Sequence, residues 1–266
     1  MNDVKNPLLA PNKTVAVIAY FLLTLLGGGI IIIILAMFYN LLHHLELNPI
    51  ELMQVISAVD ISKLEEAHLK LYVFSNSIAN LLMYILLFVI VLFFMRDHLI
   101  KDGKGLIKGY KKLAWLIPLC AALGYGISYG VEAGIGELIH QTSVNQSSIE
   151  VLIKNGGVIP MFFAVVVCAP IIEELIYRKA IFEYLKKFPI ALSYVVSVLV
   201  FTLPHVITTF MEASYTPLEN LLITIPYMLS GLLLCITYHL CNKNVYASWF
   251  FHLLNNLISF VKILLM

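Results

Sequence analysis

The sequence predicts an all-α membrane protein, a polytopic bundle of about seven transmembrane helices. Of its 266 residues, 61% are hydrophobic and only 12% are charged, whereas a soluble domain is nearer half apolar and a quarter charged. The mean hydropathy is +0.91. Apolar stretches of about 20 residues, the length that a helix needs to cross a bilayer, recur along the whole chain. Because no internal repeat and no soluble segment interrupts them, we expect one membrane domain over 1–266.

The expected spans are 14–39, 71–95, 113–136, 158–187, 189–210, 220–240 and 245–265. The first span is longer than the core of a signal peptide, which has about 7–15 residues, so we expect it to be a retained helix. The spans divide into N-terminal helices over 1–137 and a second part over 155–260 that carries most of the polar motifs.

Two segments between the spans are less apolar. In 46–70, apolar residues recur at helical spacing, which predicts an amphipathic helix at the membrane surface. The segment 138–157 is polar and is expected to be an external loop.

Lysine and arginine predict the orientation, because cytoplasmic loops carry an excess of them. All the basic connections fall on the side of the N-terminus, so we expect a cytoplasmic N-terminus in the cell membrane and an external C-terminus. The basic residues of that side are Lys5, Lys13, Arg96, Lys101, Lys104, Lys108, Lys111, Lys112, Lys186, Lys187 and Lys243. The net charge of +1 offers no basis for nucleic-acid binding. The four cysteines have the spacing of neither a zinc site nor a disulfide framework.

Two adjacent carboxylates, Glu173 and Glu174, lie in the apolar fourth span. Glu174 and Arg178 are four residues apart and can pair on one helix face. Glu173 points about 100° away, on the face of Tyr177, and is left to face the bundle interior. An unpaired carboxylate within a membrane indicates a functional site, because burying it costs free energy.

Three further polar residues lie in later spans: His205, His252 and Asn256. Counted from the basic ends of their helices at about 1.5 Å per residue, these residues and Glu173 lie about 13–24 Å deep. His252 and Asn256 are four residues apart on one face, and Phe201 lies four residues before His205, where its ring can wall the imidazole. A lone buried histidine or asparagine is more often structural. The four groups together predict a shared, water-filled cavity within the bilayer.

At these residues the sequence resembles the CPBP intramembrane proteases, also called the CAAX-protease and bacteriocin-processing or Abi family. The family pattern is E-E-x-x-x-R, then F-x-x-x-H, then a segment of small residues, then H-x-x-x-N. The matching residues here begin at Glu173, Phe201, Gly231 and His252, in the same order and one motif to a helix. Cys235 departs from the pattern, since the family often has glycine there.

The resemblance implies a glutamate-dependent endopeptidase that needs no metal or other cofactor. Glu173 would activate water with the help of His205, and His252 and Asn256 would form the oxyanion hole. The supporting residues would be Glu174, Tyr177, Arg178 and Phe201. The expected substrate is a peptide or a lipid-anchored or other membrane protein, as in bacteriocin or signalling-peptide maturation or self-immunity.

Three other functions remain open from the sequence. Two histidines and a glutamate are also a zinc set, although no H-E-x-x-H helix is present. The same fold could act as a non-catalytic adaptor that binds a membrane partner such as a sensor kinase, which would not need all four polar groups. A proton-coupled transporter would use Glu173 and the histidines as a relay, but such folds usually contain internal repeats.

Overall fold

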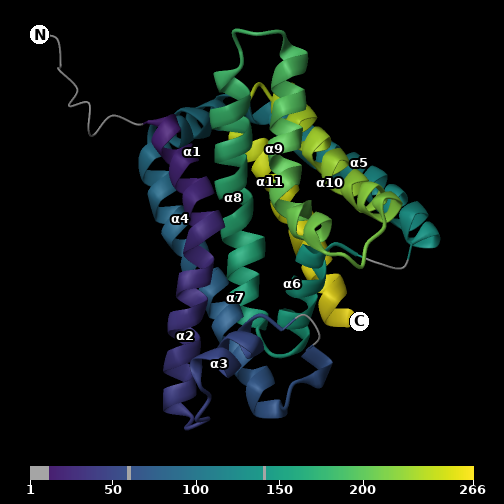
Figure 1. Ribbon diagram of the computed structural model, residues 1–266. Coiled ribbons are helices and arrows are strands. Elements are labelled where there is room, and N and C mark those ends of the chain that lie inside the picture. Colours follow the sequence, from purple (N-terminus) through teal and green to yellow (C-terminus); the bar gives the residue numbers. More distant parts are fainter. Residues whose placement is uncertain (1–11, 59–60, 140–141) are drawn as a thin grey trace, which may run out of the picture.

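The computed structural model describes residues 12–58, 61–139 and 142–266, and every regular element in them is a helix. The helices form one bundle (Figure 1). Lys5, Asp60 and Gln141, three polar residues of the connecting segments, lie outside the described residues. The elements are α1 Lys13–Leu22, η1 Leu23–Gly27, α2 Gly28–Leu42, α3 Pro49–Ile56, η2 Ile61–Lys63, α4 Glu66–Lys108, α5 Tyr110–Leu138, α6 Val144–Lys154, α7 Val158–Met161, η3 Phe162–Cys168, α8 Ala169–Glu174, η4 Leu175–Phe182, α9 Ile190–Met211, α10 Pro217–Leu240 and α11 Val245–Leu265.

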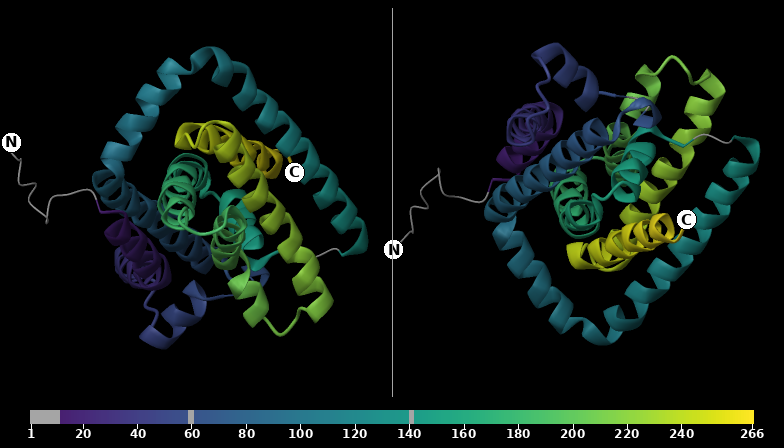
Figure 2. Two further views of the ribbon diagram at one scale, coloured as in Figure 1. Left: turned by 90° about the horizontal axis from the view of Figure 1, so that it is seen from above. Right: turned by 90° about the horizontal axis from the view of Figure 1, so that it is seen from below.

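Seven helical stretches among the described residues are long and apolar enough to cross a membrane, which confirms the predicted architecture. The stretch Val158–Phe182, made of α7, η3, α8 and η4, is the central one. Of its most apolar part 67% is buried, against 33% or less in the other six. Figure 2 shows this stretch enclosed by the other helices. The carboxylate pair therefore lies on the most enclosed helix of the bundle.

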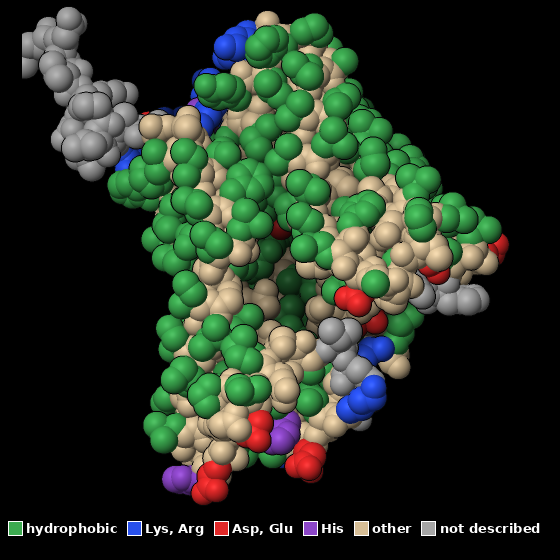
Figure 3. All heavy atoms as spheres, viewed as in Figure 1, with side chains coloured by type: hydrophobic (Ala, Val, Ile, Leu, Met, Phe, Trp, Pro, Cys, Tyr) green, Lys and Arg blue, Asp and Glu red, His purple; other side chains and the backbone are tan. Residues whose placement is uncertain are grey.

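The outward faces of the helices are apolar over most of the surface seen in Figure 3. Large hydrophobic side chains such as Leu25, Ile34, Val89 and Leu199 are at least half exposed. Water would not favour such a surface, but lipid tails do. The chain is a multi-pass membrane protein.

One prediction about the connecting segments was wrong. The polar segment 138–157 is not a loop throughout, because 144–154 forms α6, whose first turn is capped by Ser143. Leu152 and Ile153 of α6 are buried, and this apolar anchor stabilises a helix that is otherwise polar. In 46–70 an amphipathic α-helix forms as predicted, although among the described residues before α4 it covers α3 alone, and its apolar face packs into the bundle.

The basic segment 96–112, expected as a loop, is helical as well. α4 continues to Lys108, and α5 begins at Tyr110 after the single residue Gly109. Figure 2 shows the end of α4 and the length of α5 running round the outside of the inner helices. The basic residues thus lie on two helix ends that meet at a corner.

A buried polar network joins the helices at this basic end. Lys179 in η4 donates to Asp102 of α4 at 2.9 Å and to the backbone oxygen of Lys243 at 3.2 Å. Asp102 also accepts the backbone N–H of Val245, the first residue of α11, at 2.9 Å. Glu183 lies 3.0 Å from Nζ of Lys179. The network holds α4, η4 and α11 together. It could not be predicted from the sequence, because the residues that form it are far apart in the chain.

Glu183 makes the stability of this network depend on pH. Burial alone would raise its pKa, but the Tyr238 hydroxyl and the ammonium groups of Lys179 and Lys13 outweigh burial and lower the pKa to about 2, from 4.5. The carboxylate therefore stabilises the fold fully above pH 4.5, and this stabilisation is lost as the pH falls toward 2. We expect the melting temperature of the purified protein to drop across this window.

The matched variant is Glu183→Gln. It removes the charge at every pH, so its melting temperature should be lower near neutrality and should fall less steeply between pH 4.5 and 2. The exposed Glu137→Gln serves as control and should behave like the unsubstituted chain. If the melting temperatures of Glu183→Gln and of the unsubstituted chain fall equally steeply with pH, the stability of the network does not depend on the charge of Glu183.

Candidate active site

The glutamate pair lies in a helix whose hydrogen-bond ladder changes twice. π-helical segments precede and follow α8, which has Pro170 in its first turn. The N–H of Ala169 bonds to the oxygen of Ala164, five residues back. The next carbonyl, of Val165, would meet Pro170, which has no N–H. Asn256 of α11 occupies this free carbonyl, because its Nδ2 donates to the oxygen of Val165 at 2.8 Å.

The four predicted residues lie around one cavity of about 660 Å³. Glu173 comes from α8, His205 from α9, and His252 and Asn256 from α11. Oε2 of Glu173 lies 4.0 Å from Nε2 of His205 and 3.9 Å from Nε2 of His252. Figure 3 shows the surface hollowed near the middle of the face seen in Figure 1. The structure therefore brings these groups together, as the depth argument predicts, although their roles stay predictions.

Both imidazoles are held through Nδ1. Nδ1 of His205 lies 2.8 Å from the backbone oxygen of Phe201, which can only accept, so this nitrogen carries the proton. Nδ1 of His252 lies 3.1 Å from Oε1 of Glu174. With both Nδ1 atoms donating, each Nε2 faces Glu173.

Glu173 is buried, and its Oε2 has no hydrogen-bond partner among the described residues. Distances of 3.9 and 4.0 Å to the two Nε2 atoms are too long for direct hydrogen bonds. Buried polar atoms are nearly always paired, so one that faces a cavity marks a place where a ligand or water binds. The unpaired oxygen therefore points to the place where a reacting group would sit.

Glu174 and Arg178 form the predicted pair, with Nε of Arg178 3.4 Å from Oε2 of Glu174 and both side chains fully buried. Arg178 also donates to Oγ of Ser197 at 3.2 Å and to the oxygen of Gly231 at 3.4 Å. The bond from His252 to Glu174 was not foreseen, because the two residues are 78 positions apart. Glu174 thus connects Arg178 to one of the two cavity imidazoles.

Phe201 packs between these groups. Its ring lies 4.9 Å from the ring of His205 and 5.8 Å from that of His252, and the guanidinium of Arg178 lies 4.9 Å above it. Gly231 lies against the same ring, since a Cβ atom there would come within 3.0 Å of it. A larger residue at position 231 would crowd the Phe201 ring, which explains the small residue in this motif.

Tyr177 does not line the cavity, although it was expected on the same face as Glu173. Its hydroxyl is hydrogen-bonded to that of Tyr20 at 2.9 Å, and its ring packs edge-on against Phe201 at 5.5 Å. Tyr177 can support the site only through packing. Cys235, where the family often has glycine, is buried with its sulfur 3.5 Å from Oγ of Ser197.

The cavity has further polar lining that the sequence analysis missed. These residues come from α4, α5, α6, α10 and α11, outside the short motifs, so that only their packing could reveal them. They include Tyr84, Glu132, Asn145, Glu150, Tyr227, Asn255 and Lys262. The ring of Tyr227 lies 5.1 Å from that of His205.

The fold and the cavity define a class of protein, a multi-pass membrane protein with carboxylate and imidazole groups gathered inside the bilayer. Residues 155–258 match the family model for type II CAAX prenyl endopeptidase Rce1-like proteins. This match supports, for this part of the chain, the CPBP family of CAAX-type membrane proteases that the motifs predict. No curated protein and no solved structure matches the chain.

Proposed function

We propose that the protein is an intramembrane endopeptidase in which Glu173 activates a water molecule for attack on a peptide bond. The observation that carries this proposal is the unpaired Oε2 of Glu173, which faces a cavity with two Nε2 atoms about 4 Å away. A general base must lie within reach of the proton it removes, directly or through one water.

The proton balance assigns a role to each group. Glu173 takes a proton from water while His205 orients the water through Nε2, and the hydroxide oxygen adds to the peptide carbonyl. The tetrahedral intermediate carries a negative oxygen, which His252 and Asn256 stabilise. Glu173 then passes its proton to the leaving nitrogen as the C–N bond breaks.

His252 can donate from Nε2 only as an imidazolium, because its Nδ1 proton already points to Glu174. Asn256 has two amide protons, of which one is bound to Val165, and the other is available to an oxyanion. Glu174 and Arg178 hold this half of the site in place.

We propose a membrane peptide or membrane-associated protein as substrate, as in maturation of a bacteriocin or signalling peptide or in self-immunity. The N-terminus lies in the cytoplasm in this proposal, which the clustering of Lys and Arg at one end supports. Cleavage at prenylated C-termini belongs to the family description, and no feature of this chain adds support for it.

The test compares membrane and secreted peptides by mass spectrometry in cells that produce either the unsubstituted chain or Glu173→Gln. We expect peptide fragments that are present only with the unsubstituted chain. Purified protein should cleave the precursor of such a fragment equally fast with and without the metal chelator 1,10-phenanthroline. Cleavage that the chelator abolishes and zinc restores would favour the metalloprotease alternative.

Asn256→Ala should lower turnover by about 10²–10³-fold, the usual effect of removing one oxyanion donor. The protein level should remain near normal, because the side chain is half-buried and makes one neutral hydrogen bond. Asn255→Ala is the matched control, since Asn255 lines the same cavity and the sequence pattern does not include it. Turnover that is unchanged in Asn256→Ala would remove this residue from the oxyanion hole.

A further inference from the structure

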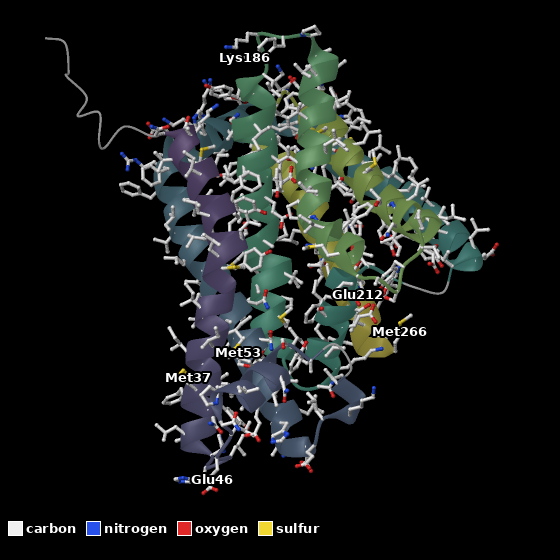
Figure 4. The ribbon with its side chains drawn as sticks, viewed as in Figure 1. Met37, Glu46, Met53, Lys186, Glu212 and Met266 are labelled. Carbon is white, nitrogen blue, oxygen red and sulfur yellow. The ribbon has the colours of Figure 1, made fainter. Side chains whose placement is uncertain are left out.

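The two ends of the bundle differ in their balance of acidic and basic side chains. Lys186 lies at one end and Glu46 at the opposite end, with Glu212 and Met266 on the same half as Glu46 (Figure 4). The corner between α4 and α5 and the segment after η4 are rich in lysine, and both belong to the end of Lys186. Apart from the glutamate pair, the described acidic residues of the other half are Glu46, Glu51, Glu65, Glu66, Glu132, Glu137, Glu150, Glu212 and Glu219, and they outnumber its described lysines, which are Lys63, Lys70, Lys154 and Lys262.

The cavity belongs to the acidic half. Its lining comes from α6, from the last turns of α5 and α11, and from the first half of α10, together with the four predicted residues. No lining residue comes from 96–112, 183–189 or 241–244, the basic segments, all of which the structure describes. The cavity therefore leads from the glutamate pair away from the lysine-rich end.

The side of the site that faces the lysine-rich end is closed. Leu175, Ile176, Tyr177 and Arg178, which follow the glutamate pair toward that end, are fully buried. Beyond them lies the Lys179–Asp102 network, which is also buried. The packing thus leaves a polypeptide no passage from the lysine-rich end to Glu173 through the described part of the bundle.

The depth of the site agrees with this direction. At about 1.5 Å per residue, His205 lies about 22 Å from the start of α9 and only about 9 Å from its end at Met211. The helix as a whole is about 33 Å long, close to the thickness of the hydrocarbon core. His205 is therefore nearer to the acidic boundary of the membrane than to the basic one.

The walls of the open part carry more acid than base. Glu132 and Glu150 line it, and Lys262 is the one lysine among its lining residues. Lys262 lies 4.7 Å from the ring centre of Tyr129. Figure 3 shows acidic side chains at the lower right edge of the hollow, with basic side chains below them. A negatively charged entrance attracts positively charged ligands and raises the rate at which they arrive.

We propose that the cavity receives its peptide from the acidic, outer face of the cell membrane, and that it favours exported peptides with positively charged flanks. This inference rests on the proposed function and adds the side of access and the charge of the substrate. The excess of lysine and arginine marks the closed end as cytoplasmic. A lipid-anchored protein at the inner leaflet would have to carry its cleavage site across most of the bilayer to reach Glu173.

The first test determines which end faces outward, with a membrane-impermeant maleimide on intact cells. Ser214→Cys places a thiol on the exposed α9–α10 connection, and Lys186→Cys places one at the opposite end. The unsubstituted chain, with three buried cysteines and one half-buried, reports the background. We expect labelling of Ser214→Cys in intact cells and of Lys186→Cys only after permeabilisation. The reverse pattern overturns the inference.

The second test measures cleavage by mass spectrometry in membrane vesicles of both orientations. The probes are two peptide mixtures with a randomised apolar centre, one flanked by lysines and the other by glutamates. We expect Glu173-dependent cleavage only when peptides are added to the outer face, about tenfold faster for the lysine-flanked mixture. Glu132→Gln combined with Glu150→Gln should bring the ratio of the two rates toward one.

The outcomes separate this inference from the function beneath it. Glu173-dependent cleavage from the cytoplasmic face, or a preference for the glutamate-flanked mixture, overturns the inference and leaves the protease standing. If neither face gives cleavage that Glu173→Gln abolishes, the proposed function fails and the inference fails with it, whatever the labelling shows.

Discussion

Glu173→Gln should reduce peptide cleavage by at least about 10²–10⁴-fold, the contribution of a well-placed general base. The change keeps the size of the side chain but removes the charge that accepts a proton from water. Because Oε2 of Glu173 has no hydrogen-bond partner among the described residues, the neutral side chain breaks no such contact of the fold. The amount of folded protein, measured by gel filtration in detergent, should stay near that of the unsubstituted chain.

His205→Ala should likewise abolish cleavage, since it removes the imidazole 4.0 Å from the carboxylate. His239→Ala is a suitable control, because His239 lies near the lysine-rich end and outside the cavity. The His239 side chain makes a hydrogen bond of 3.0 Å to the Tyr194 hydroxyl and stacks on the Tyr194 ring. Full activity of Glu173→Gln would exclude this residue as the base and would end the proposed mechanism.

Arg178→Ala should act on the fold and not only on the reaction. Arg178 is fully buried and bonds to Ser197 and to the backbone of Gly231, with its guanidinium over the ring of Phe201. Its loss leaves the buried carboxylate of Glu174 without the arginine, and breaking a buried ion pair in this way costs about 3–5 kcal/mol. We expect a large loss of folded protein from the membrane fraction and a clear drop in melting temperature.

Lys187→Ala is the control for Arg178→Ala, since this exposed lysine is a nearby basic residue on the surface. It should leave both the amount and the melting temperature unchanged. Arg178→Lys keeps one positive charge but cannot reach Ser197 and Gly231 with a planar fork, so it should give an intermediate loss. A normal amount of stable Arg178→Ala protein would show that the pair with Glu174 does not hold the fold.

The two largest effects thus separate two neighbouring parts of one helix. Glu173 faces the cavity, and removing its charge should affect the reaction alone. Arg178 lies in the packed core, where it contacts Glu174 and Phe201, so removing it should mainly lower stability. Glu173 and Arg178 are five residues apart, and at about 100° per residue their side chains point about 140° apart, so they contact different neighbours.

The short motifs could be predicted from the sequence because a polar residue in an apolar helix stands out against its neighbours. Glu173, His205, His252 and Asn256 were found in this way, and counting residues from the basic helix ends placed them at similar depths. The pair Glu174–Arg178 followed from helical spacing alone. The contact between His252 and Glu174 could not follow, since it joins positions 78 residues apart.

Connecting segments were predicted less well for a different reason. α6 is polar on most of its surface, and its helix depends on two buried residues, Leu152 and Ile153, whose partners lie on other elements. In the sequence, Lys179 is a lysine at the charged end of a span and Asp102 is an acid in a basic segment, so the pattern does not predict that they pair. They are buried only because α4 and η4 meet α11 there.

The sequence by itself determined the class of the fold, the set of polar groups within the membrane and the end at which lysine collects, because these depend on hydropathy and helical spacing within one segment. Tertiary structure decided which nitrogen of each imidazole faces Glu173, that Tyr177 turns away, and to which end the cavity opens. Those features depend on how separate helices pack, and no spacing along one helix encodes the distance to another.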